Sequence, residues 1–170
     1  MKNKKNRIKN HYILILGICV LIGCAIFSAI SVFNKVEKDD VNKSPLATNE
    51  ILYTDIKNAL KEINADTFLV ISYTGDIQVH KNEKEIEKYL KNINLLDNVM
   101  YLHMKEYVND ALYLDNLNKV LKLKGNSEIH SLPAVVFYKN GVVEYVRNSK
   151  KGCLEKNAFK NYIDQNGLAS

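Results

Sequence analysis

The stretch that decides the fold is Ser131-Leu132-Pro133-Ala134-Val135-Val136-Phe137-Tyr138-Lys139-Asn140-Gly141. Residues 134–138 are apolar, β-branched or aromatic, and a second β-rich run follows at 142–146. Asn-Gly between two such runs is the strongest short signature of a β-hairpin, because a type I′ turn needs positive φ at both central residues. The stretch therefore predicts two antiparallel strands, the first of which begins directly after a proline.

Strands and helices alternate upstream of this hairpin. Residues 67–73 form a β-branched and aromatic run without polar alternation, typical of a central strand covered on both faces, and residues 99–104 form another apolar strand. Apolar residues at helical spacing predict four helices: over 50–64, around Ile86, Leu90 and Ile93, from Leu114 to a stop at Gly125-Asn126, and from Leu154 to Ile163 with a cap at Gly167. This succession requires a right-handed parallel crossover.

The proline, strand and hairpin of residues 131–141 resemble a segment of the thioredoxin family, and the succession of helices and strands also resembles that family's order. The resemblance covers about residues 50–168. It implies an α/β, thioredoxin-like fold with a central mixed sheet of about four strands flanked by helices. It also implies that Pro133 is a cis-proline, because the family has a cis peptide bond at this place.

The dithiol that serves the family's chemistry is missing from this sequence. A thioredoxin-family oxidoreductase carries Cys-x-x-Cys where the first strand meets the second helix, so that one thiolate attacks a disulfide and the other resolves the intermediate. Here the resemblance places Asp76 and Val79 at the two cysteine positions, with Ile77 and Gln78 between them. We expect a redox-inactive site with no catalytic residue, in which Asp76 caps the helix and His80 is a solvated histidine at the helix end.

Two functions remain open on this basis. The first is a non-catalytic module that binds a protein or peptide, because in thioredoxin-like folds the groove beside the cis-proline, here Tyr73, Leu132 and Pro133, can receive an extended peptide through backbone hydrogen bonds. The alternative is an accessory protein related to thiol-disulfide oxidoreductases, of the kind found with bacteriocin export. It would act through a partner or through Cys153, the only cysteine in the domain, which has no resolving partner there.

The N-terminal part has the pattern of a bacterial membrane anchor. Residues 1–11 form a basic tail, and residues 12–33 are 22 residues without a charge, which as a helix reach about 33 Å and suffice for a single transmembrane span. The positive-inside bias puts the N-terminus in the cytoplasm and the C-terminal domain on the extracytoplasmic side of the cell membrane. Residues 34–49 are polar and are expected to be a tether.

A lipoprotein is the alternative to this uncleaved signal-anchor. Leu21-Ile22-Gly23-Cys24 resembles a lipobox, which implies cleavage before Cys24 and a lipid on that cysteine. The apolar run continues for nine residues past Cys24, whereas a lipidated cysteine is usually followed by a polar tether, so the sequence favours the uncleaved anchor. Both forms leave the domain outside.

The charges and the metal-binding side chains are not grouped. The formal net charge is +5, and five basic residues precede the first acidic one, so 19 basic residues face 19 acidic ones in the rest of the chain. Nucleic acid is therefore not an expected partner, because phosphate binding needs an excess of basic residues on one face. The four histidines and three cysteines show no ligand spacing, so neither a metal nor another cofactor is expected.

Overall fold

The computed structural model describes residues 20–28, 41–63, 65–150, 152 and 154–168. The chain divides into two compact units, Met1–Asp40 and Val41–Ser170. In the first unit, residues 20–28 are helical. Among the described residues, no helix is both long enough and apolar enough to cross a membrane. The rest of the expected span over 12–33 lies outside the described residues, as do the basic tail and residues 34–40.

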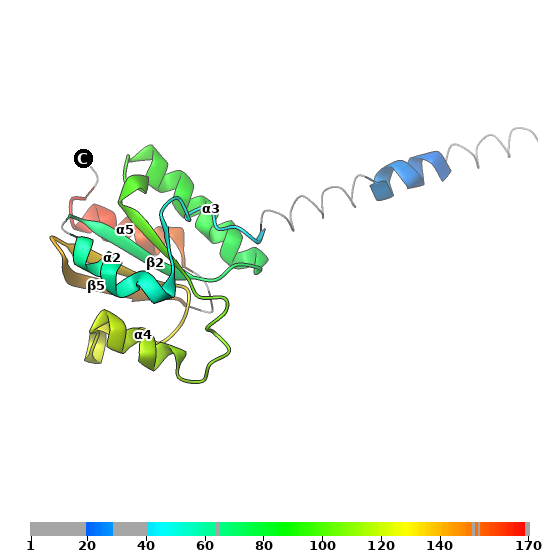
Figure 1. The fold of residues 1–170 in the computed structure, drawn as a ribbon. Coiled ribbons are helices and arrows are strands. Elements are labelled where there is room, and N and C mark those ends of the chain that lie inside the picture. The colour runs from blue at the N-terminus through cyan, green and yellow to red at the C-terminus, as the bar shows by residue number, and fades with distance from the viewer. Residues whose placement is uncertain (1–19, 29–40, 64, 151, 153, 169–170) are drawn as a thin grey trace, which may run out of the picture. The chain divides into compact units, whose positions relative to one another are not determined.

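A five-stranded sheet with the order β1-β3-β2-β4-β5 is the centre of the second unit (Figure 1). The strands are β1 (Glu50–Ile51), β2 (Thr67–Ser72), β3 (Val99–His103), β4 (Ala134–Lys139) and β5 (Val142–Asn148). Strands β1 and β2 run parallel to β3, whereas β4 is antiparallel to β2 and to β5. This mixed sheet confirms the thioredoxin-like α/β fold, with the two-residue β1 as a strand beyond the expected four.

Helices cover both faces of the sheet. On one face lie α2 (Ile56–Glu62) and α4 (Tyr113–Leu121), and on the other lie α3 (Ile77–Asn92) and α5 (Lys156–Gln165). Phe68 and Val70 of β2 pack in the core beneath α3 and α5, and Leu69 and Ile71 pack in the core beneath α2 and α4. The prediction that residues 67–73 contain a central strand covered on both faces is confirmed.

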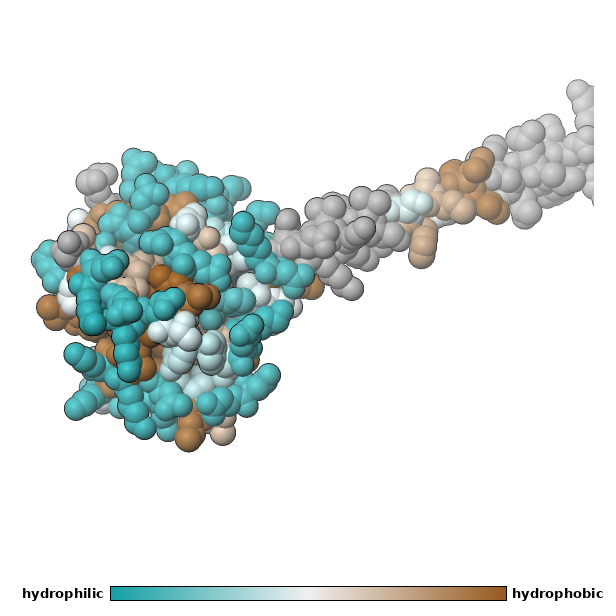
Figure 2. All heavy atoms as spheres, viewed as in Figure 1, coloured by the Kyte–Doolittle hydropathy of each residue, from teal (hydrophilic) through white to brown (hydrophobic). Residues whose placement is uncertain are grey.

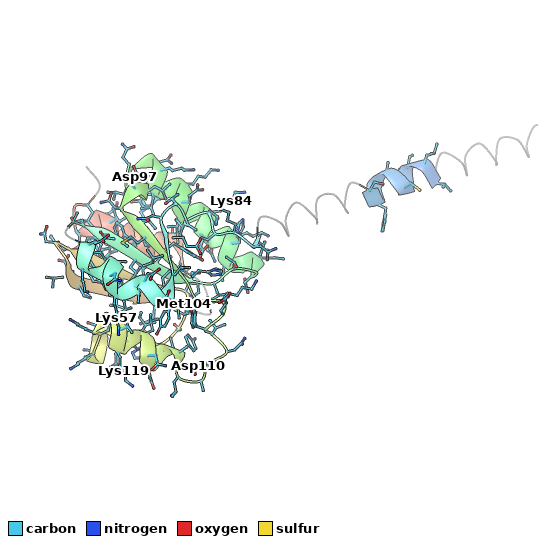
Figure 3. All side chains as sticks on the ribbon, in the orientation of Figure 1. Lys57, Lys84, Asp97, Met104, Asp110 and Lys119 are labelled. Atoms are coloured by element: carbon cyan, nitrogen blue, oxygen red, sulfur yellow. The ribbon has the colours of Figure 1, made fainter. Side chains whose placement is uncertain are left out.

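Short 3-10 helices lie in the connections, at η1 (Tyr53–Asp55), η2 (Leu96–Asn98) and η3 (Gly125–Ser127). Lysines of α2, α3 and α4 are exposed, whereas Met104, which follows β3, is fully buried; Figure 3 labels Lys57, Lys84 and Lys119 together with Met104. In Figure 2, hydrophilic residues cover most of the face in view, and smaller hydrophobic areas lie between them.

The predicted hairpin is present between β4 and β5. Asn140 and Gly141 have φ of 50° and 78°, as an Asn-Gly turn of this type requires. A Cβ atom on Gly141 would lie 2.7 Å from the carbonyl oxygen of Ile63. Glycine is therefore needed here both for its backbone conformation and for the close approach of the chain before β2.

Two helix boundaries differ from the sequence prediction. The helix expected over 50–64 begins only at Ile56, because Glu50 and Ile51 pair with β3 instead. The helix expected to reach Gly125 ends at Leu121, where Lys122 adopts a left-handed φ of 58°. Helical periodicity alone does not reveal either event, since both are decided by pairing and packing with distant residues.

Residues 41–48, which we call the strap, pack against the domain although the sequence analysis placed them in a tether over 34–49. Val41, Ser44 and Leu46 are buried, and Leu46 lies fully buried in the core beneath α3. The domain therefore starts at Val41 rather than at Glu50. A single leucine in a polar stretch has no periodicity, so the sequence did not indicate this contact.

Replacing Leu46 by alanine should destabilise the domain, because it removes a fully buried side chain. We expect a loss of about 2–5 kcal/mol in the free energy of unfolding, measured by urea unfolding of the full chain in detergent. Leu112→Ala is the matched control, since Leu112 is 58% exposed, and it should change the value by less than about 0.5 kcal/mol. Equal effects of the two variants would show that the strap is not part of the core.

Candidate functional site

The loop from β2 into α3 holds Asp76 and leads to Val79, the two residues that the resemblance places at the family's cysteine positions. Gly75 has a φ of 98°, and Asp76 is the N-cap of α3. The Oδ1 atom of Asp76 accepts hydrogen bonds from the backbone N–H groups of Gln78, at 2.7 Å, and Val79, at 3.0 Å. The expectation that Asp76 caps this helix is confirmed. Its charge lies at the positive end of the helix dipole, where it stabilises the helix.

Residues 76–79 contain no thiol. Asp76, Ile77 and Gln78 are exposed, whereas Val79 is 2% exposed and packs in the core. The chain's cysteines stand at positions 19, 24 and 153. Cys24 is exposed in the helix of residues 20–28, and the other two lie outside the described residues.

The expected peptide groove is only partly open. The Leu132–Pro133 peptide bond is cis, as expected, and the pairing of Ile71 with Ala134 places Tyr73 opposite Leu132. Leu132 and Pro133 are nevertheless buried, and the Leu132 carbonyl oxygen accepts a 3.0 Å hydrogen bond from the Ser149 hydroxyl. Of the residues that follow β2, Tyr73 is half-buried and Ile77 is 52% exposed.

A row of three polar side chains, which the sequence analysis did not find, connects β1, β2 and β3 near this end of the sheet. The Thr74 hydroxyl lies 3.2 Å from Nε2 of His103, and Nδ1 of His103 lies 3.6 Å from a carboxylate oxygen of Glu50. These residues follow β2, end β3 and begin β1, respectively. These two contacts orient the His103 imidazole and link the loop before α3 to the sheet.

A second polar group, inside the domain, was also missed. Glu83 of α3 is 2% exposed, and its two carboxylate oxygens accept 2.5 Å hydrogen bonds from the hydroxyls of Ser44 and Ser72. Burial raises the pKa of Glu83, and the two hydrogen bonds partly offset that rise. The buried Tyr101 hydroxyl has no hydrogen-bond partner among the described residues. Burial and then the nearby charge of Glu83 raise the pKa of Tyr101.

The sequence did carry a signal for the burial of Glu83. Val79, Glu83, Ile86 and Leu90 follow the i, i+4, i+7, i+11 spacing of one helix face, and the structure buries all four. Its serine partners lie 39 and 11 residues away in the chain, so no local pattern could identify them.

His80 differs from the expected solvated histidine. It is half-buried, and its Nδ1 atom is buried without a hydrogen-bond partner in the part of the chain that the structure describes. Among the same residues, no group of three or more His, Cys, Asp or Glu side chains is placed to hold a metal ion.

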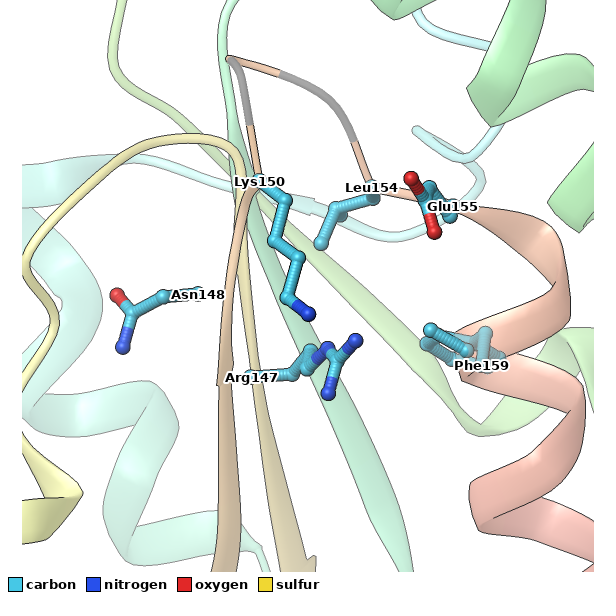
Figure 4. A pocket seen from close by; sticks show the side chains of 7 residues that line it. Arg147, Asn148, Lys150, Leu154, Glu155 and Phe159 are labelled. Atoms are coloured by element: carbon cyan, nitrogen blue, oxygen red, sulfur yellow. The ribbon is translucent and has the colours of Figure 1, made fainter.

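Two hollows of the described domain are lined by residues outside this loop. Figure 4 shows one between β5 and the start of α5, lined by Arg147, Lys150 and Phe159 among others. Its volume of about 10 Å³ accommodates about one water molecule and no organic ligand. A wider, open hollow beside the C-terminal end of α4 is lined by charges of both signs, including Lys119 and Asp115.

Several solved structures that are similar to this chain are thioredoxins. Thioredoxin O2 from Arabidopsis thaliana is 11% identical, with 72% of this chain and 96% of that chain covered and a TM-score of 0.47. Thioredoxin f2 from Chlamydomonas reinhardtii is 10% identical, with 69% and 94% covered and a TM-score of 0.48. No protein-family model matches the sequence, and no curated protein matches it. The fold assignment rests on the strand order and pairing described above.

Removing the helix cap should cost stability and leave the fold intact. Asp76→Ala deletes the acceptor of two backbone hydrogen bonds, and we expect a loss of about 0.5–2 kcal/mol in urea unfolding of the full chain. Asp76→Asn keeps an acceptor and should lose less. Glu106→Ala, at an exposed loop position, is the control. A loss for Asp76→Ala no larger than that of the control would contradict the capping role.

Proposed function

We propose that this chain is a membrane-anchored, extracytoplasmic thioredoxin-like domain that binds a segment of another protein or a peptide without thiol chemistry. The observation that carries the proposal is the Asp76 cap. A carboxylate accepts the N–H groups of Gln78 and Val79 at the helix start, where a family oxidoreductase needs its reactive thiolate. What remains at this edge of the sheet is a surface for recognition.

The binding surface in this proposal lies around Tyr73 and Ile77, between the end of β2 and the start of α3. An isoleucine that is 52% exposed at the first position of a helix gains from burial against a partner. Tyrosine is enriched among residues that dominate binding energy. Recognition of an extended segment through backbone groups and side-chain pockets requires no cysteine.

The membrane part of the proposal is supported by the helix of residues 20–28. Its large apolar side chains are more than half exposed, including Leu21 at 71% and Phe27 at 73%. A helix that is hydrophobic on all sides is suited to a lipid environment. The basic tail before it favours a cytoplasmic N-terminus. A lipid on Cys24 is the alternative form of anchoring.

Crosslinking from intact membranes tests the binding surface. A photoreactive amino acid in place of Ile77 should capture a protein or peptide, because this side chain is exposed at the proposed surface. The matched control is Val142, which is 69% exposed. It lies at the opposite end of β2, beside the turn between β4 and β5. The products would be identified by mass spectrometry.

The two positions should give different products. An adduct that forms from position 77 and not from position 142 supports the proposal. Identical products from both positions, or no adduct from position 77, contradict it. If capture requires Cys153 and is lost in Cys153→Ser, the accessory role in thiol-disulfide chemistry replaces the proposed one.

A further inference from the structure

The strap is fixed at three points, and each lies close to the α3 loop or to α3 itself. The Val41 carbonyl oxygen accepts a 2.9 Å hydrogen bond from the N–H of Gly75, one residue before the Asp76 cap. The Ser44 hydroxyl donates to Glu83, one turn into the body of α3 beyond Val79. Leu46 is fully buried in the core cluster that also contains Val70 and Ile86. The strap is therefore attached both to the loop that holds the candidate site and to α3.

Glu83 is the polar centre of this attachment. One of its oxygens binds the strap through Ser44, and the other binds β2 through Ser72. The Ser44 hydroxyl also accepts a 3.1 Å hydrogen bond from the N–H of Leu46, so the turn of the strap is built around the same contact. With the strap in place, the carboxyl group of Glu83 is withdrawn from water.

Release of the strap would return this carboxyl group to solvent. Water favours its charged form, whereas the closed core favours its neutral form, so the docking of the strap and the charge of Glu83 are linked. We propose that the Ser44–Glu83–Ser72 bridge is a pH-dependent latch that holds the strap against the α3 loop at acidic pH and loosens it as the pH rises. In this way the latch regulates partner binding at the surface around Tyr73 and Ile77.

The sign follows from the direction of the shift. Burial raises the pKa of Glu83 in the docked form, so the latch has its full strength below the pKa of a solvated glutamate, about 4.3, and loses strength as the pH rises through the raised pKa.

Among the described residues, the Tyr101 hydroxyl of β3 lies near Glu83, and His80 and Glu87 lie one turn away from it on α3. The neutral hydroxyls of Ser72 from β2 and Ser44 from the strap contact it. The charged residue of the strap, Lys43, is exposed.

The regulatory consequence rests on the proposed function. While the strap is docked, the Gly75 N–H is occupied by Val41 and cannot bind a partner's backbone. When the strap leaves, that donor becomes free one residue before Asp76 and two before Ile77. Partner binding at this edge should therefore increase as the pH rises and Glu83 ionises.

Hydrogen exchange of the full chain in detergent tests the latch without any partner. Protection of residues 41–48 and of the Gly75 amide, corrected for the intrinsic exchange rate at each pH, should fall at least about threefold between about pH 4 and about pH 8. Glu83→Gln keeps the shape and cannot ionise, so its protection should not change with pH. Ser44→Ala should lower protection at every pH. Glu85→Gln, which alters an exposed carboxylate of α3, should behave as the natural chain.

The outcomes separate the latch from the proposed function. A pH dependence that is absent in the natural chain, or that persists in Glu83→Gln, overturns the latch whatever the crosslinking shows. A pH dependence that Glu83→Gln abolishes supports it, and the yield of the position 77 adduct should then rise several-fold with pH in the natural chain and not in Glu83→Gln. An equal adduct yield at both pH values overturns regulation of the edge and leaves partner binding itself intact.

Discussion

The structure depends on the need to cover β2 on both faces. Five of its six residues are buried, so each face requires its own layer: α2 and α4 on one, α3 and α5 on the other. Once α3 is fixed on its face, its N-terminus lies at the end of β2, beside the cis peptide bond before β4. The candidate site is where these constraints meet.

The group at the start of α3 decides what chemistry this end of the sheet can offer. Here the Asp76 carboxylate accepts the N–H groups of Gln78 and Val79, and the Val79 side chain is buried. A capping carboxylate favours a stable helix start. The interior holds a buried acid, Glu83, whose partners belong to the strap and to β2. The stability of the start of α3 is therefore coupled to the docking of the strap.

Local patterns predicted the parts of the fold that depend on local chemistry. The Asn140-Gly141 turn, the cap at Asp76 and the apolar run of β2 are each determined by residues adjacent in sequence. The strap, the short β1 and the Thr74 to His103 contact join residues far apart in the chain, and no periodicity marks them. Leu132 and Pro133 illustrate the same limit, since the resemblance to the thioredoxin family implied their cis bond and no local pattern indicated the packing that buries them.

The central claim is that this thioredoxin-like domain acts without dithiol exchange. Reduction of insulin disulfides by the full chain, supplied with a thiol reductant and compared with Cys153→Ser, measures this most directly. The account predicts that both proteins leave the rate at that of the reductant alone, because a carboxylate and a buried valine stand where the resemblance to the thioredoxin family places the two cysteines. A faster rate with the natural chain that Cys153→Ser abolishes would contradict it.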